Sequence, residues 1–261
     1  MNPSATLTVG SQLREWRQRR RLSQLDLSVD AEVSTRHLSF VETGRAMPSR
    51  EMVLRLADRL EVPLRERNRL LIAAGFAPRF AERALDDPAL QSAREAVELI
   101  LKGHEPYPAL AIDRHWTLVS YNRAVPLLLE GVAPALLRPP LNVLRISLHP
   151  EGLAPRIANL AQWRAHLLAR LRQQVDISAD PVLAALADEL RVYPAPPQAH
   201  PDITETAVVV PLVLATPQGM LSFISTTTVF GTPLDITLSE LALETFFPAD
   251  AATAAVLRQT Q

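Results

Sequence analysis

The sequence predicts two domains of different class: a small all-α domain of five helices, followed by an α+β domain with a mostly antiparallel sheet. Three observations favour this division. Apolar residues recur at helical spacing through residues 8–75, with proline, glycine and serine at the breaks. Residues 76–95 carry prolines and mixed charge. Beyond residue 104, short β-rich runs and helical segments alternate.

The chain length of 261 residues fits two domains. We expect residues 1–80 to form the first domain and residues 104–261 the second. The intervening segment, 81–103, is predicted to be a connector that contains a helix from about Pro88 to Lys102.

The five helices of the first domain follow from apolar residues that share one helix face. In chain order these are Leu13 and Trp16; Leu25, Leu27 and, less regularly, Val29; Leu38 and Val41; Met52, Val53, Leu56, Ala57 and Leu60; and Leu64, Leu70, Leu71 and Ala74. The breaks have suitable chemistry. Ser23 and Asp26 are spaced as a capping box, and Ser34 can cap the third helix. Gly44 and Gly75 stand where the third and fifth helices should end.

The second domain is predicted to contain two strands, then helices, then three further strands. The strand candidates are 108–113, 117–121, 207–214, 220–230 and 236–247, and the helix candidates are 123–130, 154–175 and a segment near 182–190. The last strand needs a bulge near Ser239, and a helix there is the alternative. Pro217-Gln218-Gly219 is a hairpin signal, which favours antiparallel pairing. The proline-rich segment 194–197 is expected to be a linker or rigid loop.

The composition excludes several classes of protein and of site. Hydrophobic residues make up 48% of the chain and charged residues 21%, as in a globular protein. Cysteine is absent, so disulfide scaffolds and thiolate sites are excluded. His104, Asp113, His115 and His149 lack the spacing of a metal or acid–base motif, and no nucleotide-binding or nucleophile motif occurs. We expect no catalytic residue, metal or cofactor.

The sequence also predicts a cytoplasmic location without a membrane partner. The longest apolar stretch, 207–215, contains Pro211 and is too short to cross a bilayer. The N-terminus has no basic-then-apolar signal pattern.

The net charge of −1 hides an asymmetry between the two domains. Residues 1–83 hold 15 arginines and no lysine against 10 acidic residues, a balance of +5; the remainder holds 12 basic against 18 acidic residues, a balance of −6. A basic module joined to an acidic domain favours a polyanion, such as nucleic acid, as the partner of the first domain. Ordinary scatter in composition is the alternative.

Two of the predicted helices are arranged in a way that suits DNA. The helices over Gln24–Ala31 and Ser34–Glu42 are joined by the tight turn Glu32-Val33. In such a pair the second helix can enter the major groove. The residues expected to contact DNA are Gln24, Ser34, Thr35, Arg36, Ser39, Phe40, Arg45 and Arg50.

These candidates have different roles on a duplex. Arg36 can offer two hydrogen bonds to guanine, and Thr35 a hydroxyl and a methyl group. Gln24, at a helix start, and the arginines at 45 and 50 are candidates for phosphate contacts. Phe40 can contact a thymine methyl group or simply pack.

Residues 8–75 resemble the Cro/lambda-repressor-type helix-turn-helix domain. The similarity is carried by Leu22-Ser23-Gln24, Ala31, Val33-Ser34, Leu38, Glu42, Gly44, Pro48-Ser49 and Leu54–Leu60. The resemblance implies that Ser34–Glu42 is the recognition helix and that Arg17 pairs with Glu42. The chemistry agrees, because a carboxylate facing DNA would repel phosphate, so Glu42 is expected to brace the fold.

Further segments resemble MmyB-like transcription regulators across nearly the whole chain. They are RERNRLLIAAGFAP at 65–78, LDDPAL at 85–90, HEPYPALAIDRHWTLVSYNRA at 104–124 and TFFPADAAT at 245–253. The resemblance implies a second domain of PAS-like fold that binds a small apolar ligand such as a fatty acid.

The candidate ligand contacts are Trp116, Tyr121 and Phe223 for an apolar body, and Arg145 and His149 for a carboxylate head. The last two are four residues apart, so they share a face if their segment is helical. Each candidate has a structural alternative: the aromatic residues can be core, Arg145 a solvated helix residue and His149 a cap.

Two further points bear on the ligand site. Phe223 and Phe230 fall on opposite faces of a regular strand, so at most one of them can face a pocket unless a bulge intervenes. Weaker candidates for the head group are His104, Tyr107, Arg114, His115 and Asn122, of which Asn122 can also cap a helix.

The function predicted from these features is sequence-specific transcription regulation. We expect a homodimer on a duplex operator with two half-sites. A ligand in the second domain would shift the dimer geometry through residues 76–103. Two alternatives stay open: the second domain can be a ligand-free dimerisation platform, or the first can be an adaptor that does not bind DNA.

Overall fold

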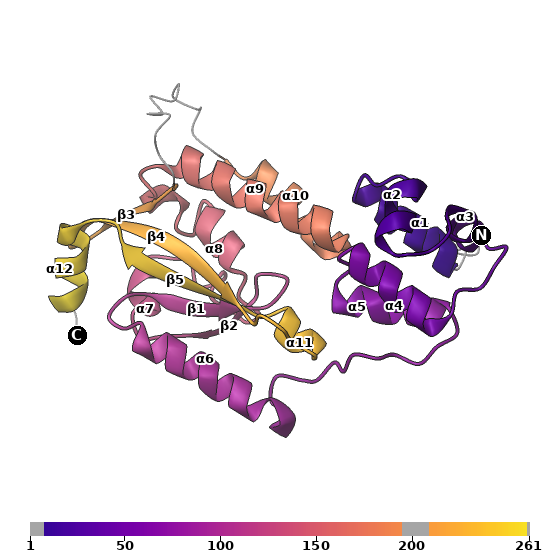
Figure 1. Cartoon of the computed structure of the whole chain (residues 1–261). Helices are drawn as coiled ribbons and strands as arrows, with labels where there is room; N and C mark the ends of the chain where they lie inside the picture. Colours follow the sequence, from indigo (N-terminus) through magenta and orange to yellow (C-terminus); the bar gives the residue numbers. More distant parts are fainter. Residues whose placement is uncertain (1–7, 195–208, 260–261) are drawn as a thin grey trace. The chain divides into compact units, whose positions relative to one another are not determined.

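The computed structural model describes residues 8–194 and 209–259. It divides into two compact units (Figure 1). The first consists mainly of the described part of Met1–Arg83, and the second of most of the chain from Ala84 onward.

Five α-helices make up the first unit, among the residues described, at the five predicted places. They are α1 (Val9–Arg19), α2 (Gln24–Asp30), α3 (Thr35–Glu42), α4 (Arg50–Arg59) and α5 (Leu64–Ala73). Side-chain oxygens of Thr8, Ser23, Ser34 and Ser49 cap the first four by accepting a backbone N–H of the first turn. Asp26 completes the predicted capping box.

The helices of the first unit meet around fully buried leucines: Leu13, Leu27, Leu38, Leu56, Leu60, Leu70 and Leu71. The prediction for α2 is wrong in one respect. Leu25 and Val29 are 62% and 68% exposed, and of the three apolar residues proposed for this helix only Leu27 is buried. Leu27 lies two residues from each of the other two, a spacing that places its side chain on the opposite side of a helix from theirs.

Helices α1 and α3 approach closely at Gly10, where α1 carries no side chain. A Cβ atom built on Gly10 would lie 2.0 Å from the carbonyl oxygen of Val41 in α3. This is far inside a van der Waals contact with backbone atoms that cannot rotate away. The packing of α1 on α3 therefore requires glycine at this position.

A five-stranded antiparallel sheet organises the second unit. In order across the sheet, the strands are β2 (Leu118–Tyr121), β1 (Ala109–Ile112), β5 (Ala242–Pro248), β4 (Gly219–Val229) and β3 (Leu212–Thr216). All neighbours pair antiparallel, so the predicted sheet type is confirmed. The predicted hairpin joins β3 to β4, with Thr216 opposite Gly219.

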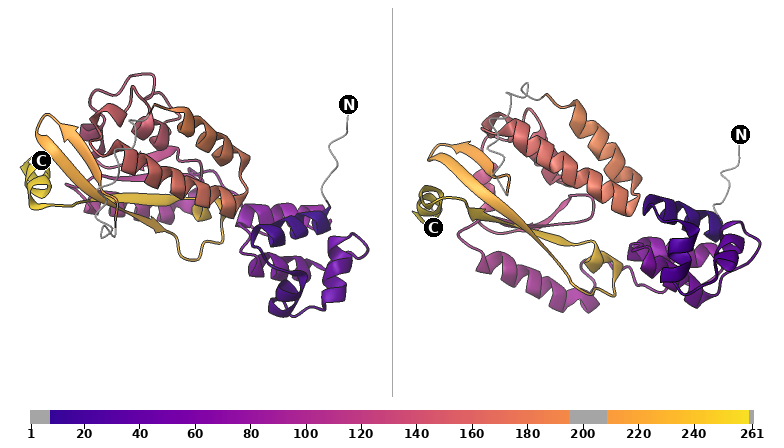
Figure 2. Two further views of the ribbon diagram at one scale, coloured as in Figure 1. Left: turned by 90° about the horizontal axis from the view of Figure 1, so that it is seen from above. Right: turned by 45° about the horizontal axis from the view of Figure 1, so that its top comes forward.

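Helices cover both faces of this sheet (Figures 1 and 2). The 3-10 turn η1 (Pro88–Leu90) and α6 (Gln91–Gly103) precede β1, and α6 packs on one face through Val97 and Leu101. The other face carries α7 (Val125–Leu128), α8 (Val143–Leu148), α9 (Leu160–Ser178) and α10 (Pro181–Val192). The helix α12 (Ala251–Gln259) follows β5. The helix expected in the connector is therefore a layer of the second unit.

The two phenylalanines near β4 lie on opposite sides of the sheet, as expected. Phe223 belongs to the large core beneath α8, α9 and α10. Phe230, the residue after β4, packs against the smaller cluster that contains Val97 and Leu101 of α6.

Two predicted elements need correction. Residues 236–247 do not form one strand, because the amides of Glu240 and Leu241 bond back to the carbonyls of Thr237 and Leu238 and close a helical turn, α11 (Ile236–Ser239), before β5. The helix predicted over 154–175 is interrupted, since Ile157 is extended and bridges to Leu214. It divides into the 3-10 turn η2 (Ala154–Arg156) and α9.

Two other elements are shorter than predicted. The helix expected over 123–130 shrinks to α7, and β3 begins only after Pro211, which has no N–H to donate to a sheet. Of the linker predicted over 194–197, residues 195–197 lie outside the described residues, as do residues 207–208 of the predicted strand.

The close approach at Gly10 yields a stability prediction. Gly10→Ala should destabilise the first unit by about 1–3 kcal/mol or more, because α1 and α3 must move apart to admit the methyl group. Urea unfolding followed by circular dichroism measures this. Gly103→Ala is the matched control, since a Cβ at Gly103 meets nothing within 4 Å. Equal stability of the two variants would contradict the packing argument.

Candidate functional site

Helix α3 presents Arg36 in its first turn, directly after the Ser34 cap. The Arg36 side chain is exposed, and its guanidinium carbon lies 5.4 Å from the centroid of the half-buried Phe40 ring. This cation–π contact gives the arginine a preferred direction along the helix surface. Phe40 is half-buried, so the two roles predicted for it, a contact with a thymine methyl group and packing, both stay predictions.

Three other predicted contacts are engaged with protein. The Ser34 hydroxyl accepts the backbone N–H of His37. The hydroxyls of Thr35 and Ser28 lie 2.8 Å apart and link α3 to α2. The side-chain amide of Gln24 donates to Glu42 over 2.8 Å, so in this structure it braces the fold.

The arginines proposed for phosphates are both exposed. Arg45 follows Gly44, whose φ of +75° ends α3, and its backbone N–H donates to the carbonyl of Phe40. Arg50 is the first residue of α4. Ser39 is partly exposed on α3, and its carbonyl accepts the Thr43 hydroxyl.

A buried ion pair holds α3 against α1. Arg17 donates from Nε and Nη2 to the two carboxylate oxygens of Glu42 at 2.7 and 2.8 Å, and from Nη1 to the carbonyl of Leu22. The Glu42 side chain is completely buried. Burial alone would raise the pKa of Glu42, but the hydrogen bonds from Arg17 and Gln24 outweigh it and hold this pKa below its usual value.

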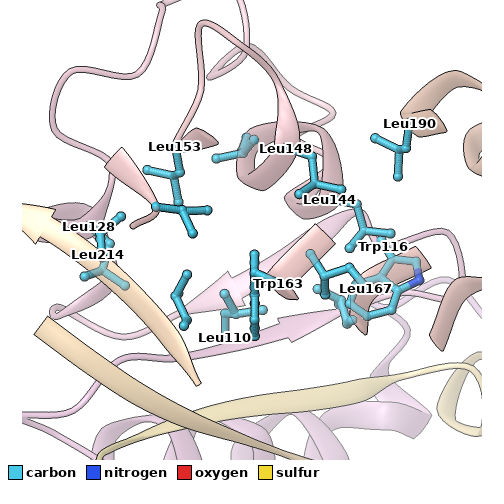
Figure 3. Close-up of a cluster of buried hydrophobic side chains, with 14 of the residues drawn as sticks. Leu110, Trp116, Leu128, Leu144, Leu148, Leu153, Trp163, Leu167, Leu190 and Leu214 are labelled. Atoms are coloured by element: carbon cyan, nitrogen blue, oxygen red, sulfur yellow. The ribbon is translucent and has the colours of Figure 1, made fainter. Parts of the chain in front are cut away.

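The second candidate site is a cavity of about 90 Å³ in the second unit, between the sheet and helices α7, α8 and α9. Figure 3 shows the surrounding cluster of leucines, with Trp116 and Trp163 among them. The lining is apolar except for Ser147, Arg170, Ser225 and Glu244.

The polar part of the lining is a charged cluster. Arg170 of α9 donates from Nη2 and Nη1 to the two carboxylate oxygens of Glu244 in β5, at 2.6 and 3.3 Å. Thr227 bridges the pair, accepting from Arg170 and donating to Glu244. The guanidinium carbon of Arg170 lies 4.9 Å from the Trp116 ring centroid.

Trp116 occupies an unusual backbone position in the turn between β1 and β2. Its φ is +65°, in the left-handed region that large side chains rarely adopt. Its indole N–H donates to Gln174 over 2.7 Å, and its carbonyl accepts the N–H of Val143. Such strain persists only where the surroundings fix it, and it is frequent at ligand sites.

Of the five predicted ligand contacts, only Trp116 lines this cavity. Tyr121 is 52% exposed. Phe223 is buried core and packs edge to face on Phe246. Arg145 points to the surface, where it forms an ion pair with Glu189. His149 ends α8, and its ring accepts the N–H of Glu151.

The weaker head-group candidates also have structural partners. His104 bonds the carbonyl of Phe246, and His115 bonds Asp180. Arg114 pairs with Asp180 and Glu240. Asn122 is buried: its amide donates to the carbonyls of Leu101 and Tyr107, and its oxygen accepts from the N–H groups of Ala109 and Ala124. It does not cap α7, whose N-cap is Ala124 and which has no side-chain cap hydrogen bond. Tyr107 is partly buried and packs against the large core of the second unit.

Arg170 and Glu244 are not among the site residues that the sequence predicts. A signal was present: each charge interrupts an apolar pattern, Glu244 within the run 241–247 and Arg170 between Leu168 and Leu171. A buried charge needs a partner, but the partner lies 74 residues away and only the fold identifies it.

The comparisons with known proteins bear on both sites. The MmyB-like transcription regulator ligand binding domain matches residues 93–259, and a helix-turn-helix domain matches residues 8–70. The chain belongs to the MmyB-like transcription regulator family. Its first unit is therefore the helix-turn-helix domain of a DNA-binding transcription regulator, and its second unit contains the family's ligand-binding domain.

No curated protein matches the chain. Among solved structures, the clp gene regulator ClgR from Corynebacterium glutamicum is 24% identical over 41% of this chain and 99% of that chain, with a TM-score of 0.24. A TM-score so low carries no structural argument.

Residues 8–194 and 209–259 lack two kinds of feature. No helix in these ranges combines the length and apolar character that crossing a membrane requires. No group of three or more histidine, aspartate or glutamate side chains is placed to hold a metal ion.

The Arg17–Glu42 pair yields a stability prediction with a pH dependence. Glu42→Gln leaves Arg17 buried without a counter-charge and should cost about 3–5 kcal/mol of unfolding free energy. Because the pKa of Glu42 is lowered in the folded state, its contribution is full above the unfolded value of about 4.3. It is lost as the pH falls through the folded value.

Urea unfolding at several pH values checks this prediction. Glu15→Gln is the control, because Glu15 forms only an exposed ion pair with Arg19, worth less than about 1 kcal/mol. A similar small cost for both variants would show that the buried pair does not hold α3 in place.

Proposed function

We propose that the chain is a sequence-specific regulator that reads its operator with α3. The observation that carries this proposal is that α3 exposes Arg36 beside Phe40, while the ion pair between Arg17 and Glu42 holds α3 against α1. A guanidinium in the first turns of a recognition helix can donate two hydrogen bonds to guanine in the major groove.

The remaining surface residues complete the interface in this proposal. Thr35, Ser39 and Phe40 face bases beside Arg36, and Arg45 and Arg50 neutralise phosphates. Ser34 fixes the helix start, and Gln24 acts on DNA only if it leaves Glu42. The excess of five positive charges in residues 1–83 supports a polyanionic partner.

The second half of the proposal is that the cavity beneath α7, α8 and α9 binds a small, largely apolar ligand. The lining is largely apolar, so each Å² of apolar ligand surface removed from water would contribute about 25 cal/mol to the free energy of binding. The chain of a fatty acid, the ligand that the resemblance implies, meets this requirement. The PAS-like fold expected for this domain is part of the proposal.

Regulation then requires two states that differ in DNA affinity. A ligand changes DNA affinity only when it binds these states unequally. We propose a cytoplasmic homodimer that binds an operator whose two half-sites lie about 34 Å apart. In each subunit, residues 81–103 connect the DNA-reading domain, 1–80, to the domain for sensing and dimerisation, 104–261. A ligand-free dimerisation platform is the alternative for the second domain.

The DNA part is tested with Arg36→Ala on an operator selected from random duplexes. Specific affinity should fall about 5- to 150-fold, a loss of about 1–3 kcal/mol, with little change on non-specific DNA. Arg59→Ala, which removes an exposed arginine of α4 outside the proposed interface, is the control. Equal losses on both kinds of DNA would make Arg36 a phosphate contact.

The sensing part is tested by native mass spectrometry of the purified full-length protein. We expect the mass of a dimer together with a small molecule that denaturation releases. A dimer without added mass would favour the dimerisation platform, and a monomer would contradict the model with two half-sites.

A further inference from the structure

We propose that two copies of the chain dimerise through the outer face of α6, with the two helices packed antiparallel about a two-fold axis. This inference rests on the homodimer of the proposed function and names the surface that forms it. It follows from apolar side chains that are exposed on α6 and from the order of the charges beside them.

Helix α6 carries apolar side chains on two faces. Val97 and Leu101 are buried against one face of the sheet, whereas α8, α9 and α10 lie on the other face (Figure 1). Leu99 and Ile100 lie outside this contact and are 71% and 42% exposed. A helix on the surface of a monomer ordinarily has a polar outer face, so apolar residues on both sides indicate that a further element covers α6.

The exposed apolar residues have the spacing of a helix–helix contact. Leu99 and Ile100 follow Ala96 by three and four residues, so the three side chains share one side of α6. Glu95 and Lys102 border this side and lie on either side of Leu99 along the helix axis. An apolar strip with charges along its border is the pattern of helices that pair with one another.

A second copy of the same helix complements this strip when it runs in the opposite direction. In a two-fold contact, residue i faces residue j of the other copy, and residue j faces residue i. An axis near residues 97 and 98 brings the small side chain of Ala96 in one copy between Leu99 and Ile100 of the other. The same contact occurs twice, so large side chains meet a small one on both sides of the axis.

The charges select this direction. Glu95 and Lys102 are seven residues apart, close to two helical turns, and therefore lie on the same side of α6. In the antiparallel pair, Glu95 of each copy lies beside Lys102 of the other, and two ion pairs border the apolar contact. In a parallel pair, each residue would lie level with its own equivalent, and Glu95 would not meet Lys102.

The Glu95 carboxylate is available for this ion pair. Its Oε1 accepts a hydrogen bond from the side-chain amide of Gln91 on the same helix, and its Oε2 can accept from a lysine of the second copy. Exposed ion pairs contribute little to affinity, so they set the orientation while the apolar contact supplies the affinity.

The test measures the dissociation constant of the full-length dimer by sedimentation equilibrium. Leu99→Glu should raise this constant at least about tenfold, because a carboxylate replaces an apolar side chain at the centre of the contact. Val192→Glu is the matched control, since Val192 is 82% exposed at the end of α10, a helix on the opposite face of the sheet. Circular dichroism verifies that both variants are folded.

Charge reversal tests the antiparallel order. Glu95→Lys alone should raise the dissociation constant about threefold or more at low ionic strength, because it places two positive charges together at both ends of the contact. Glu95→Lys combined with Lys102→Glu should return the constant to the wild-type value, since both ion pairs form again with their members exchanged. A double variant that stays as weak as Glu95→Lys would overturn the antiparallel interface.

Failure of the inference and failure of the homodimer give different results. A wild-type dimer that Leu99→Glu leaves unchanged would overturn the inference, keep the homodimer, and leave the outer face of α6 to a partner other than a second copy. A wild-type protein that is monomeric at high micromolar concentration would contradict the homodimer and the inference with it.

Discussion

The buried ion pair between Arg17 and Glu42 is the interaction on which the proposed DNA-reading surface depends. It joins α1 to α3 at the point where Gly10 allows the two backbones to approach. A nearly buried guanidinium and a fully buried carboxylate tolerate little displacement, since separation would leave each of them desolvated without its hydrogen-bonded partner. The pair therefore holds α3 against α1, and Arg36 lies on the exposed surface of α3.

The second unit uses the same interaction for a different purpose. Arg170 and Glu244 join α9 to β5, but they do so at the wall of a cavity, beside apolar side chains. Apolar residues of similar size would often stabilise such a place equally well or better. Stability alone thus gives little reason for an ion pair whose carboxylate is buried at this place.

Local patterns predicted the parts of this structure that local interactions determine. Helices in the first unit, the capping box at Ser23 and the hairpin before β4 depend on residues a few positions apart. The pairing of β1 with β5 does not, since it joins residues 130 to 136 positions apart. Four of the five predicted ligand contacts lie away from the cavity for the same reason: Arg145, for example, suits an anionic head by its chemistry, but the fold places it at the surface with Glu189.

The size of the cavity constrains how a ligand could act on the rest of the molecule. About 90 Å³ is smaller than the 150 Å³ or so of an engineered cavity that admits benzene, so any larger ligand must separate the helices from the sheet. Trp163, Leu167 and Arg170 line the cavity from one face of α9, at helical spacing. Displacing this face moves the whole 19-residue helix, because a packed helix shifts as a unit. The energy of ligand binding would then appear as a change in the position of α9, and the proposed control of DNA affinity requires that the ligand bind the shifted and unshifted arrangements unequally.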